Sequence, residues 1–137
     1  MNHFSNKHYF TMPNEIFSLG LSASEIAVYA YLRCLENPST YQCWPSYATI
    51  GKAIGRTKNT VMQYVDALSE KGLISTEPTS VLMRSGIKKN GNLRYTLRPI
   101  REAVEIFHTR QLSAVEHAAE RQRVQRKLSA MDMLPGA

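Results

Sequence analysis

The sequence predicts a mainly helical fold with one small β-hairpin and a long C-terminal helix, and three observations support this prediction. Apolar residues recur at helical spacing in several segments that are bounded by capping residues, glycine or proline. A stretch at 93–97 alternates between apolar and polar residues, as a strand does. The basic charge is local, because residues 45–98 carry nine lysines and arginines against three acidic residues. This net +6 equals the formal charge of the whole chain and indicates a surface for a polyanion.

Length and composition limit the class of protein. A chain of 137 residues is expected to form one domain, here with an appendage. It has no run of about 18 apolar residues and no apolar segment near its start, so we expect neither a membrane helix nor a secretory signal. Two cysteines, Cys34 and Cys43, are too few for a disulfide framework. The sequence therefore predicts a cytoplasmic protein whose two thiols are reduced and packed in the interior.

The N-terminal part of the sequence predicts irregular chain followed by one helix. The first 13 residues read as an extended lead-in that includes YFTMP, an edge-strand candidate, and residues 14–20 can form a single helical turn. Ser22 followed by Glu25 fits a capping box, in which each side chain accepts a hydrogen bond from the other residue's backbone amide. Apolar residues then recur at helical spacing, so we expect a helix over about 22–36.

Two glycines four residues apart define the central motif, GKAIGRTKNTVMQYV at 51–65. A glycine inside a helix costs about 1 kcal/mol relative to alanine, so one long helix is disfavoured. Two helices that cross closely need a small residue, here Gly51, and the turn between them needs a residue that takes positive φ, here Gly55. Val61 then faces back into the core as an apolar anchor. This spacing predicts a helix-turn-helix, whose second helix enters the major groove of DNA.

The helix after the turn, about 57–71, has one buried face and one outward face. Its apolar residues recur at i, i+4 and i+7 from Val61, and Ser46 and Thr57 are expected to cap the two helices of the motif. Outward amides can bond an adenine edge, a lysine can reach guanine or phosphate, and a helix start can hold a phosphate. We therefore expect DNA contacts from Ser46, Tyr47, Arg56, Thr57, Lys58, Asn59, Thr60, Met62 and Gln63.

A basic β-hairpin is expected after this recognition helix. Its β-prone stretches are 73–76, 81–84 and 93–97, and Asn90-Gly91 is a dipeptide typical of the tight turn between two strands. A basic loop beside a groove-reading helix is typical of the wing of a winged helix, which follows phosphates or the minor groove. The wing, about 84–94, adds expected DNA contacts from Arg84, Lys88, Lys89, Asn90 and Arg94.

Three runs resemble the winged helix-turn-helix domain of bacterial, phage and plasmid proteins, which includes replication-initiator N-terminal domains and helix-turn-helix regulators. These runs are LSASEIAVYAYL, WPSYATIGKAIGRTKNTVMQYVDALSEKGLI and NGNLRYTL. The family signature appears here as Pro45-Ser46, as the segment 55–61 and as the segment 68–74. The resemblance covers about residues 10–98 and implies DNA binding through the third helix and the wing. Gly51 stands where alanine is more usual, which leaves the position small.

The chain is thus expected to have three parts: an extended lead-in (1–13), a winged helix-turn-helix DNA-binding domain (14–98) and a C-terminal helix (99–137). The apolar face of that helix, over residues 99–119, pairs with the same helix of a second chain, packs on its own domain, or docks on a partner protein. We favour a homodimer, because a pseudo-palindromic DNA site demands one.

Other chemistry is not indicated by the sequence. The four histidines are scattered and show no metal-ligand spacing with a cysteine or carboxylate cluster. No phosphate-cradling glycine loop and no nucleophile–base signature is present. We therefore expect no enzymatic activity, no cofactor and no metal site, and no small-molecule ligand is evident.

The function predicted best is sequence-specific binding of double-stranded DNA by a transcriptional regulator. The rival within DNA binding is a replication-initiation or replisome-organiser protein of a plasmid or phage, and the short chain without a large second domain favours regulation. The alternative of another class is a protein-interaction module, since winged helices also serve as docking scaffolds. The local charge and the amide-rich outward face favour DNA.

Overall fold

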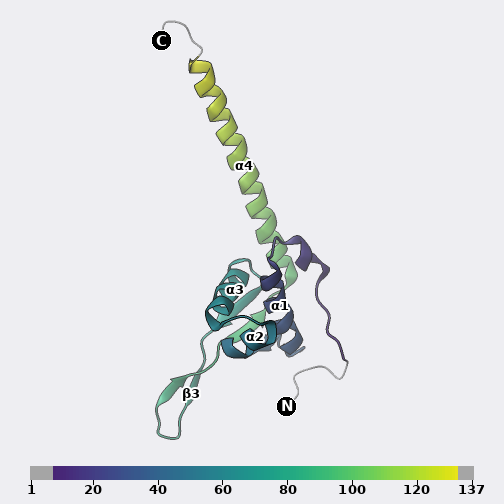
Figure 1. Ribbon diagram of the computed structural model, residues 1–137, viewed down its shortest axis with the longest axis vertical. Helices are drawn as coiled ribbons and strands as arrows, with labels where there is room; N and C mark the ends of the chain where they lie inside the picture. Colours follow the sequence, from purple (N-terminus) through teal and green to yellow (C-terminus); the bar gives the residue numbers. More distant parts are fainter. Residues whose placement is uncertain (1–7, 133–137) are drawn as a thin grey trace. The chain divides into compact units, whose positions relative to one another are not determined.

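The computed structural model describes residues 8–132, apart from the side chains of Val81, Lys88 and Lys89. Three helices pack together in its N-terminal half, preceded by the 3-10 helix η1, and Figure 1 shows them as one group. The helical elements are η1 (Asn14–Ser18), α1 (Ala23–Leu35), α2 (Tyr47–Ile54), α3 (Lys58–Glu70) and α4 (Ile100–Asp132). The strands are β1 (Gln42–Cys43), β2 (Ile74–Glu77), β3 (Ser80–Leu82), β4 (Lys88–Asn90) and β5 (Arg94–Leu97).

Each helix of the N-terminal half starts at the capping residue that the sequence predicts. The Glu25 amide donates to the Ser22 hydroxyl (3.2 Å) and the Ser22 amide to the Glu25 carboxylate (2.9 Å), which confirms the capping box. Ser46 and Thr57 cap α2 and α3, because each hydroxyl accepts from the backbone amide three residues on, at 3.0 and 3.3 Å. These local bonds fix where α2 and α3 begin.

The crossing of α2 and α3 depends on the two glycines of the motif. Gly55 has φ +73°, so it makes the left-handed turn as predicted. The Arg56 amide donates to the Gly51 carbonyl at 2.9 Å, which closes the turn against α2. A Cβ added at Gly51 would clash with the backbone carbonyl oxygen of Arg56 and lie 3.6 Å from Cγ2 of Val61. The position therefore requires glycine in this chain, although alanine is more usual there in the family that the sequence resembles.

A single core joins the three helices to the sheet. The predicted apolar stripe of α3 is buried, since Val61, Val65 and Leu68 are at most 1% exposed. The core is completed by apolar side chains from η1, α1, α2 and the strands, among them Ile16, Val28, Tyr29, Leu32, Ile50, Leu73, Ile74 and Tyr95. Because α3 buries one face here, its opposite face is left for solvent or a ligand.

The β-structure differs from the single hairpin that the sequence predicts. Strand β5 lies between β1 and β2 in an antiparallel sheet, while β3 and β4 form a separate two-stranded ladder. That ladder turns at Gly86 (φ +83°), whose amide donates to the Met83 carbonyl at 2.9 Å. Asn90-Gly91 lies at the base of the ladder, where the Gly91 amide donates to the Thr79 carbonyl at 2.9 Å. Placing the tight turn at Asn90-Gly91 was therefore wrong.

The N-terminal and C-terminal segments also bear on the predictions. No strand forms within residues 8–13, so the edge-strand candidate YFTMP is an irregular lead-in.

Helix α4 confirms the long C-terminal helix; its residues up to Val104 belong to the first of two compact units, and those from Glu105 form the second. Within residues 8–132, no helix combines the length and apolar character needed to cross a membrane.

Replacing Gly51 with alanine is expected to lower the free energy of unfolding by about 1 to 2 kcal/mol, because the new methyl group meets the Arg56 carbonyl in a closed turn. Denaturant unfolding followed by circular dichroism measures the change. Ala53 is exposed in the same helix, and Ala53→Gly is the matched control, expected to cost about 1 kcal/mol through helix propensity alone. An increase in stability for Gly51→Ala would contradict the close approach.

Candidate nucleic-acid interface

The outward face of α3 gathers the residues that the sequence predicts for base contacts. Lys58, Asn59, Met62 and Gln63 are all exposed; Asn59 and Gln63 lie opposite the buried stripe of the helix, and Lys58 and Met62 flank it. Thr60 is half-buried. An α-helix that presents one cationic and two amide side chains along one face has the donors and acceptors that match base edges in the major groove.

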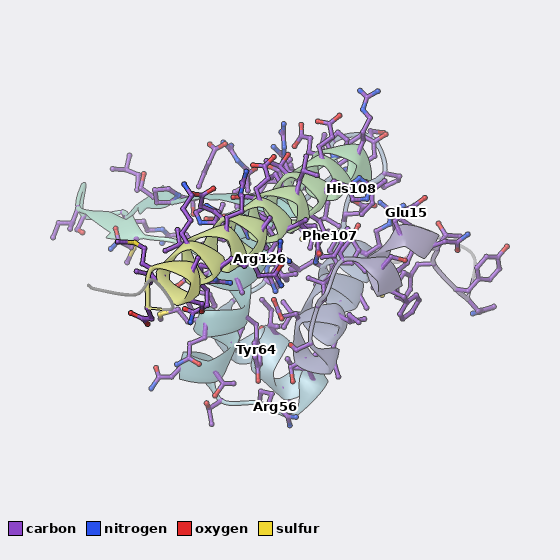
Figure 2. All side chains as sticks on the ribbon, turned by 90° about the horizontal axis from the view of Figure 1, so that it is seen from above. Glu15, Arg56, Tyr64, Phe107, His108 and Arg126 are labelled. Carbon is purple, nitrogen blue, oxygen red and sulfur yellow. The ribbon has the colours of Figure 1, made fainter. Side chains whose placement is uncertain are left out.

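The starts of α2 and α3 have the same hydroxyl arrangement. Thr57 and Thr60 hydroxyl oxygens are 2.8 Å apart, and so are those of Ser46 and Thr49. These hydroxyls thus bond within their own helix caps. Arg56, between the two helices, is exposed and donates from Nη1 to the Gly55 carbonyl at 3.1 Å. Figure 2 shows its side chain at the periphery of the helical group.

A cleft of about 350 Å³ lies between the start of α2 and the base of the β3–β4 ladder. It brings together three predicted site residues from distant parts of the chain, Ser46, Tyr47 and Asn90. Thr79 and Asn92, which were not among the predicted contacts, line the same cleft. Asn92 Nδ2 donates to the Trp44 carbonyl at 3.1 Å and so links the ladder to the chain before α2. No local pattern could have shown this bond, because its partners are 48 residues apart.

Two tyrosines beside the cleft keep their protons. Burial raises the pKa of Tyr47 above its ordinary value of 10.0, and the negative charge of Asp66 on α3 raises it further. Burial also raises the pKa of Tyr95, and nearby Tyr47 adds to the effect. The phenol of Tyr47 is therefore neutral at physiological pH and can donate a hydrogen bond to an anion.

Ion pairs reduce the number of free basic residues in the segment 45–98, whose net charge predicts a basic surface. Lys71 Nζ lies 2.7 Å from Glu25 Oε2, Arg94 pairs with Glu77 across β5 and β2, and Arg98 pairs with Glu102 through two bonds of 2.9 and 3.0 Å. Among the residues that the structure describes, the exposed basic residues of 45–98 outside ion pairs are Lys52, Arg56, Lys58 and Arg84. The side chains of Lys88 and Lys89, predicted wing contacts, lie outside the described residues.

This distribution shifts the cationic groups toward the start of α3 and the end of the wing. Arg94, a predicted DNA contact, is held by Glu77 and is 35% exposed in its side chain, so its charge is partly compensated. Arg84 is exposed in the turn region of the ladder, and Asn90 is exposed at its base.

The Glu25–Lys71 pair fixes the far end of α3. Glu25 is only 7% exposed and lies in the first turn of α1, whereas Lys71 immediately follows α3. Burial acts to raise the pKa of Glu25, but hydrogen bonds from Lys71 and Ser22 outweigh it, so the pKa lies below its ordinary value of 4.5. Helix α3 is thus capped by Thr57 at one end and tied to α1 at the other.

The helix-turn-helix arrangement of α2 and α3 is also found when the chain is compared with known proteins. Residues 19–74 match the model of a helix-turn-helix domain family. Among solved structures, a possible transcriptional regulator from Methanosarcina mazei is similar over 78% of this chain and 81% of that protein, with 14% identity and a TM-score of 0.50. A MarR-like transcriptional regulator from Thermotoga maritima is similar over 92% and 86%, with 18% identity and a TM-score of 0.44. No curated protein matches the chain.

The fold and the match together define the class of this domain. Residues 19–74 contain α1, α2, α3 and the start of β2, and they have the arrangement of the helix-turn-helix family model that they match. With the strands that follow, the three helices have a winged helix-turn-helix fold, in which the β3–β4 ladder has the place of the wing. Within the described part of the chain, no group of three or more His, Cys, Asp or Glu residues could hold a metal ion.

The Glu25–Lys71 pair predicts a pH dependence of stability. Because the pKa of folded Glu25 is lowered, its contribution is complete above the unfolded pKa of about 4.3 and is lost as pH falls through the folded pKa. Glu25→Gln should lower the unfolding free energy by about 1 to 2 kcal/mol at pH 7. The deficit relative to wild type should shrink below about pH 4.5.

Urea unfolding at several pH values measures this difference. Glu15→Gln, which removes an exposed carboxylate of η1, is the control and should follow wild type at each pH. A deficit for Glu25→Gln that stays constant down to pH 3 would show that the carboxylate charge does not hold α3.

Proposed function

We propose that the protein binds double-stranded DNA in a sequence-specific manner and regulates transcription. The observation that carries this proposal is the exposed face of α3, where Lys58, Asn59 and Gln63 stand on a helix fixed at both ends. A rigid helix keeps amide and ammonium groups at the spacing that base edges require, so little ordering is left to binding. In this proposal α3 lies in the major groove, with Met62 available for contact with a thymine methyl group.

The surroundings of α3 supply the groups that hold the DNA backbone. Arg56 precedes the helix, and the cleft at the wing base presents Ser46, Tyr47 and Asn90. Hydroxyl, phenol and amide groups of this kind position a duplex through its phosphates without reading its sequence. Arg84 extends the contact surface into the wing. A role in transcription is supported by the descriptions of the similar structures, which name a possible and a MarR-like transcriptional regulator.

We further propose a homodimer through residues 99–119 of α4. Two winged domains related by a two-fold axis match a pseudo-palindromic site, in which each half-site occupies one turn of DNA. Exposed apolar side chains in this stretch, such as Leu112 and Val115, give a second helix a surface to cover.

Base contacts by α3 predict a loss of sequence preference when its amides are removed. A binding site is first recovered from a randomised duplex pool with the wild-type protein. Asn59→Ala and Gln63→Ala should each lower affinity for this site by about tenfold to a hundredfold, with little change for random duplex. Fluorescence anisotropy with both duplexes measures the ratio. Ser69→Ala, at an exposed position near the end of α3, is the control.

Contacts with the DNA backbone predict a loss of affinity that does not depend on the DNA sequence. Lys88→Ala, Lys89→Ala and Arg84→Ala should weaken binding to every duplex alike, and each should reduce the slope of log affinity against log salt by about 1. Affinity that none of the α3 and wing substitutions alters would rule out this mode of DNA binding. Binding sites that map to a replication origin rather than to promoters would assign the same DNA-binding mode to replication.

The proposed dimer interface is tested by two valines on opposite sides of α4. Val115 and Val124 are both exposed and stand nine residues apart, about two and a half helical turns. Val115→Glu should convert the dimer to a monomer in sedimentation velocity, whereas Val124→Glu should not. A monomeric wild type, or equal effects of both substitutions, would exclude an interface on the 99–119 face.

A further inference from the structure

The far end of the wing carries large apolar side chains that face solvent. Leu82 is 69% exposed, Ile87 66% and Met83 44%. Figure 1 shows the ladder labelled β3 extending away from the three helices, and it shares no strand with the sheet that joins the core. Leu82 is opposite Lys88 in the ladder, and Met83 and Ile87 form the next cross-strand pair, so Met83 and Ile87 share one face and Leu82 lies on the other. Exposed apolar side chains that share a face are typical of a surface that another molecule covers.

Residues 82–87, called here the wing tip, form a closed turn. The Met83 amide donates to the Ile87 carbonyl at 2.9 Å, and the Gly86 amide donates back to the Met83 carbonyl at 2.9 Å. Gly86 takes φ +83°, which a glycine adopts without strain. The apolar side chains are therefore presented by a hydrogen-bonded turn, and binding needs little further ordering of the backbone.

The charge around the wing tip favours a polyanion as the molecule that covers it. Arg84 lies exposed between the apolar residues, and Lys88 and Lys89 follow in the sequence. No acidic residue occurs anywhere in residues 78–101. An apolar docking surface for an ordinary protein is usually rimmed by both signs of charge, whereas a DNA groove attracts cations alone. Arginine in particular suits the strong negative potential of a narrow minor groove.

The length of the wing fits the spacing of DNA grooves. From Ser80 to Gly86 the chain spans about 20 Å in extended form. The minor groove next to a helix in the major groove lies about half a helical repeat away, or about 17 Å. The wing base is fixed near α3, because Asn92 bonds to the chain before α2, and α2 crosses α3 closely at Gly51. The wing tip can therefore reach the adjacent minor groove while α3 stays in place.

We propose that the wing tip inserts Met83 and Ile87, which share one face of the hairpin, between base pairs in the minor groove and kinks the DNA. Apolar wedges of this kind partly unstack one base step and bend the duplex toward the major groove. Arg84 then holds the groove edge beside the wedge. The inference rests on the DNA binding proposed above, and it adds bending of the target as a second activity. It also implies indirect readout, because pyrimidine–purine steps unstack more easily than A-tracts.

Energy transfer between dyes at the two ends of a 30-base-pair duplex measures bending. The probe is the duplex recovered from the randomised pool with wild-type protein. Binding of wild type should raise the transfer efficiency to that of a bend of about 20 to 90°. Thymines at the kinked step should also become reactive to permanganate, which attacks unstacked thymine.

Two matched double variants isolate the wedge. Met83→Asn with Ile87→Asn should bind the duplex without the rise in energy transfer and without permanganate reactivity. Met83→Leu with Ile87→Leu keeps the apolar volume and should bend the DNA as wild type does. Replacing the reactive step with an A-tract should lower the wild-type affinity by about tenfold and leave that of the asparagine variant unchanged. Both substituted positions are exposed, and equal unfolding midpoints confirm that each variant is folded.

The outcomes separate this inference from the proposed function. Binding of the duplex by wild type without bending overturns the wedge and leaves DNA binding intact. Equal bending by the asparagine variant likewise overturns it, and assigns the apolar tip to another partner. Failure of wild type to bind any duplex at low salt overturns DNA binding itself, and the wedge with it.

Discussion

The contact between Gly51 and the Arg56 carbonyl is the constraint on which the rest of the interface depends. It sets how closely α2 and α3 approach, because any side chain at residue 51 would push the turn away. The approach brings Val61 into the core, and the period of the helix then decides which residues face outward. The orientation of Asn59 and Gln63 is thus determined by a backbone contact several residues earlier. Substitutions on the outward face of α3 can therefore change its side-chain chemistry while the contact at Gly51 keeps the position of the helix.

The reading helix and the wing are held in different ways. Helix α3 has its start fixed by the Thr57 cap and its end by the partly buried pair of Glu25 and Lys71. The wing is a two-stranded ladder with no core of its own, connected to the body through β2, β5 and the bond from Asn92. An isolated hairpin is marginally stable in water, so the wing adapts to its ligand more easily than α3 does. In the proposed mode of binding, base readout therefore belongs to α3, and adjustment to the groove belongs to the wing.

Local signals explain which parts of the fold could be predicted. The caps at Ser46 and Thr57 and the left-handed turn at Gly55 act within a few residues, so α2 and α3 were predicted within a residue or two. The hairpin was placed wrongly because β5 must pair with both β1 and β2, and that long-range demand outweighs the turn preference of Asn90-Gly91. The same limit applies to the site. Its α3 face followed from periodicity, whereas the cleft that contains Asn92 depends on contacts across the sheet.

The ion pairs show why the net charge alone overstates the DNA-binding surface. Three of the nine basic residues in 45–98 are paired with carboxylates that hold the fold together, so they contribute less to an external field. The described cations that are left lie around the turn before α3 and at the wing tip, at the two ends of the proposed contact surface. A duplex that is bound at two separated points can be held bent between them. A duplex bound at a single patch can change its orientation without bending. The separation of charge thus complements an apolar tip, because it resists the straightening of a bent duplex.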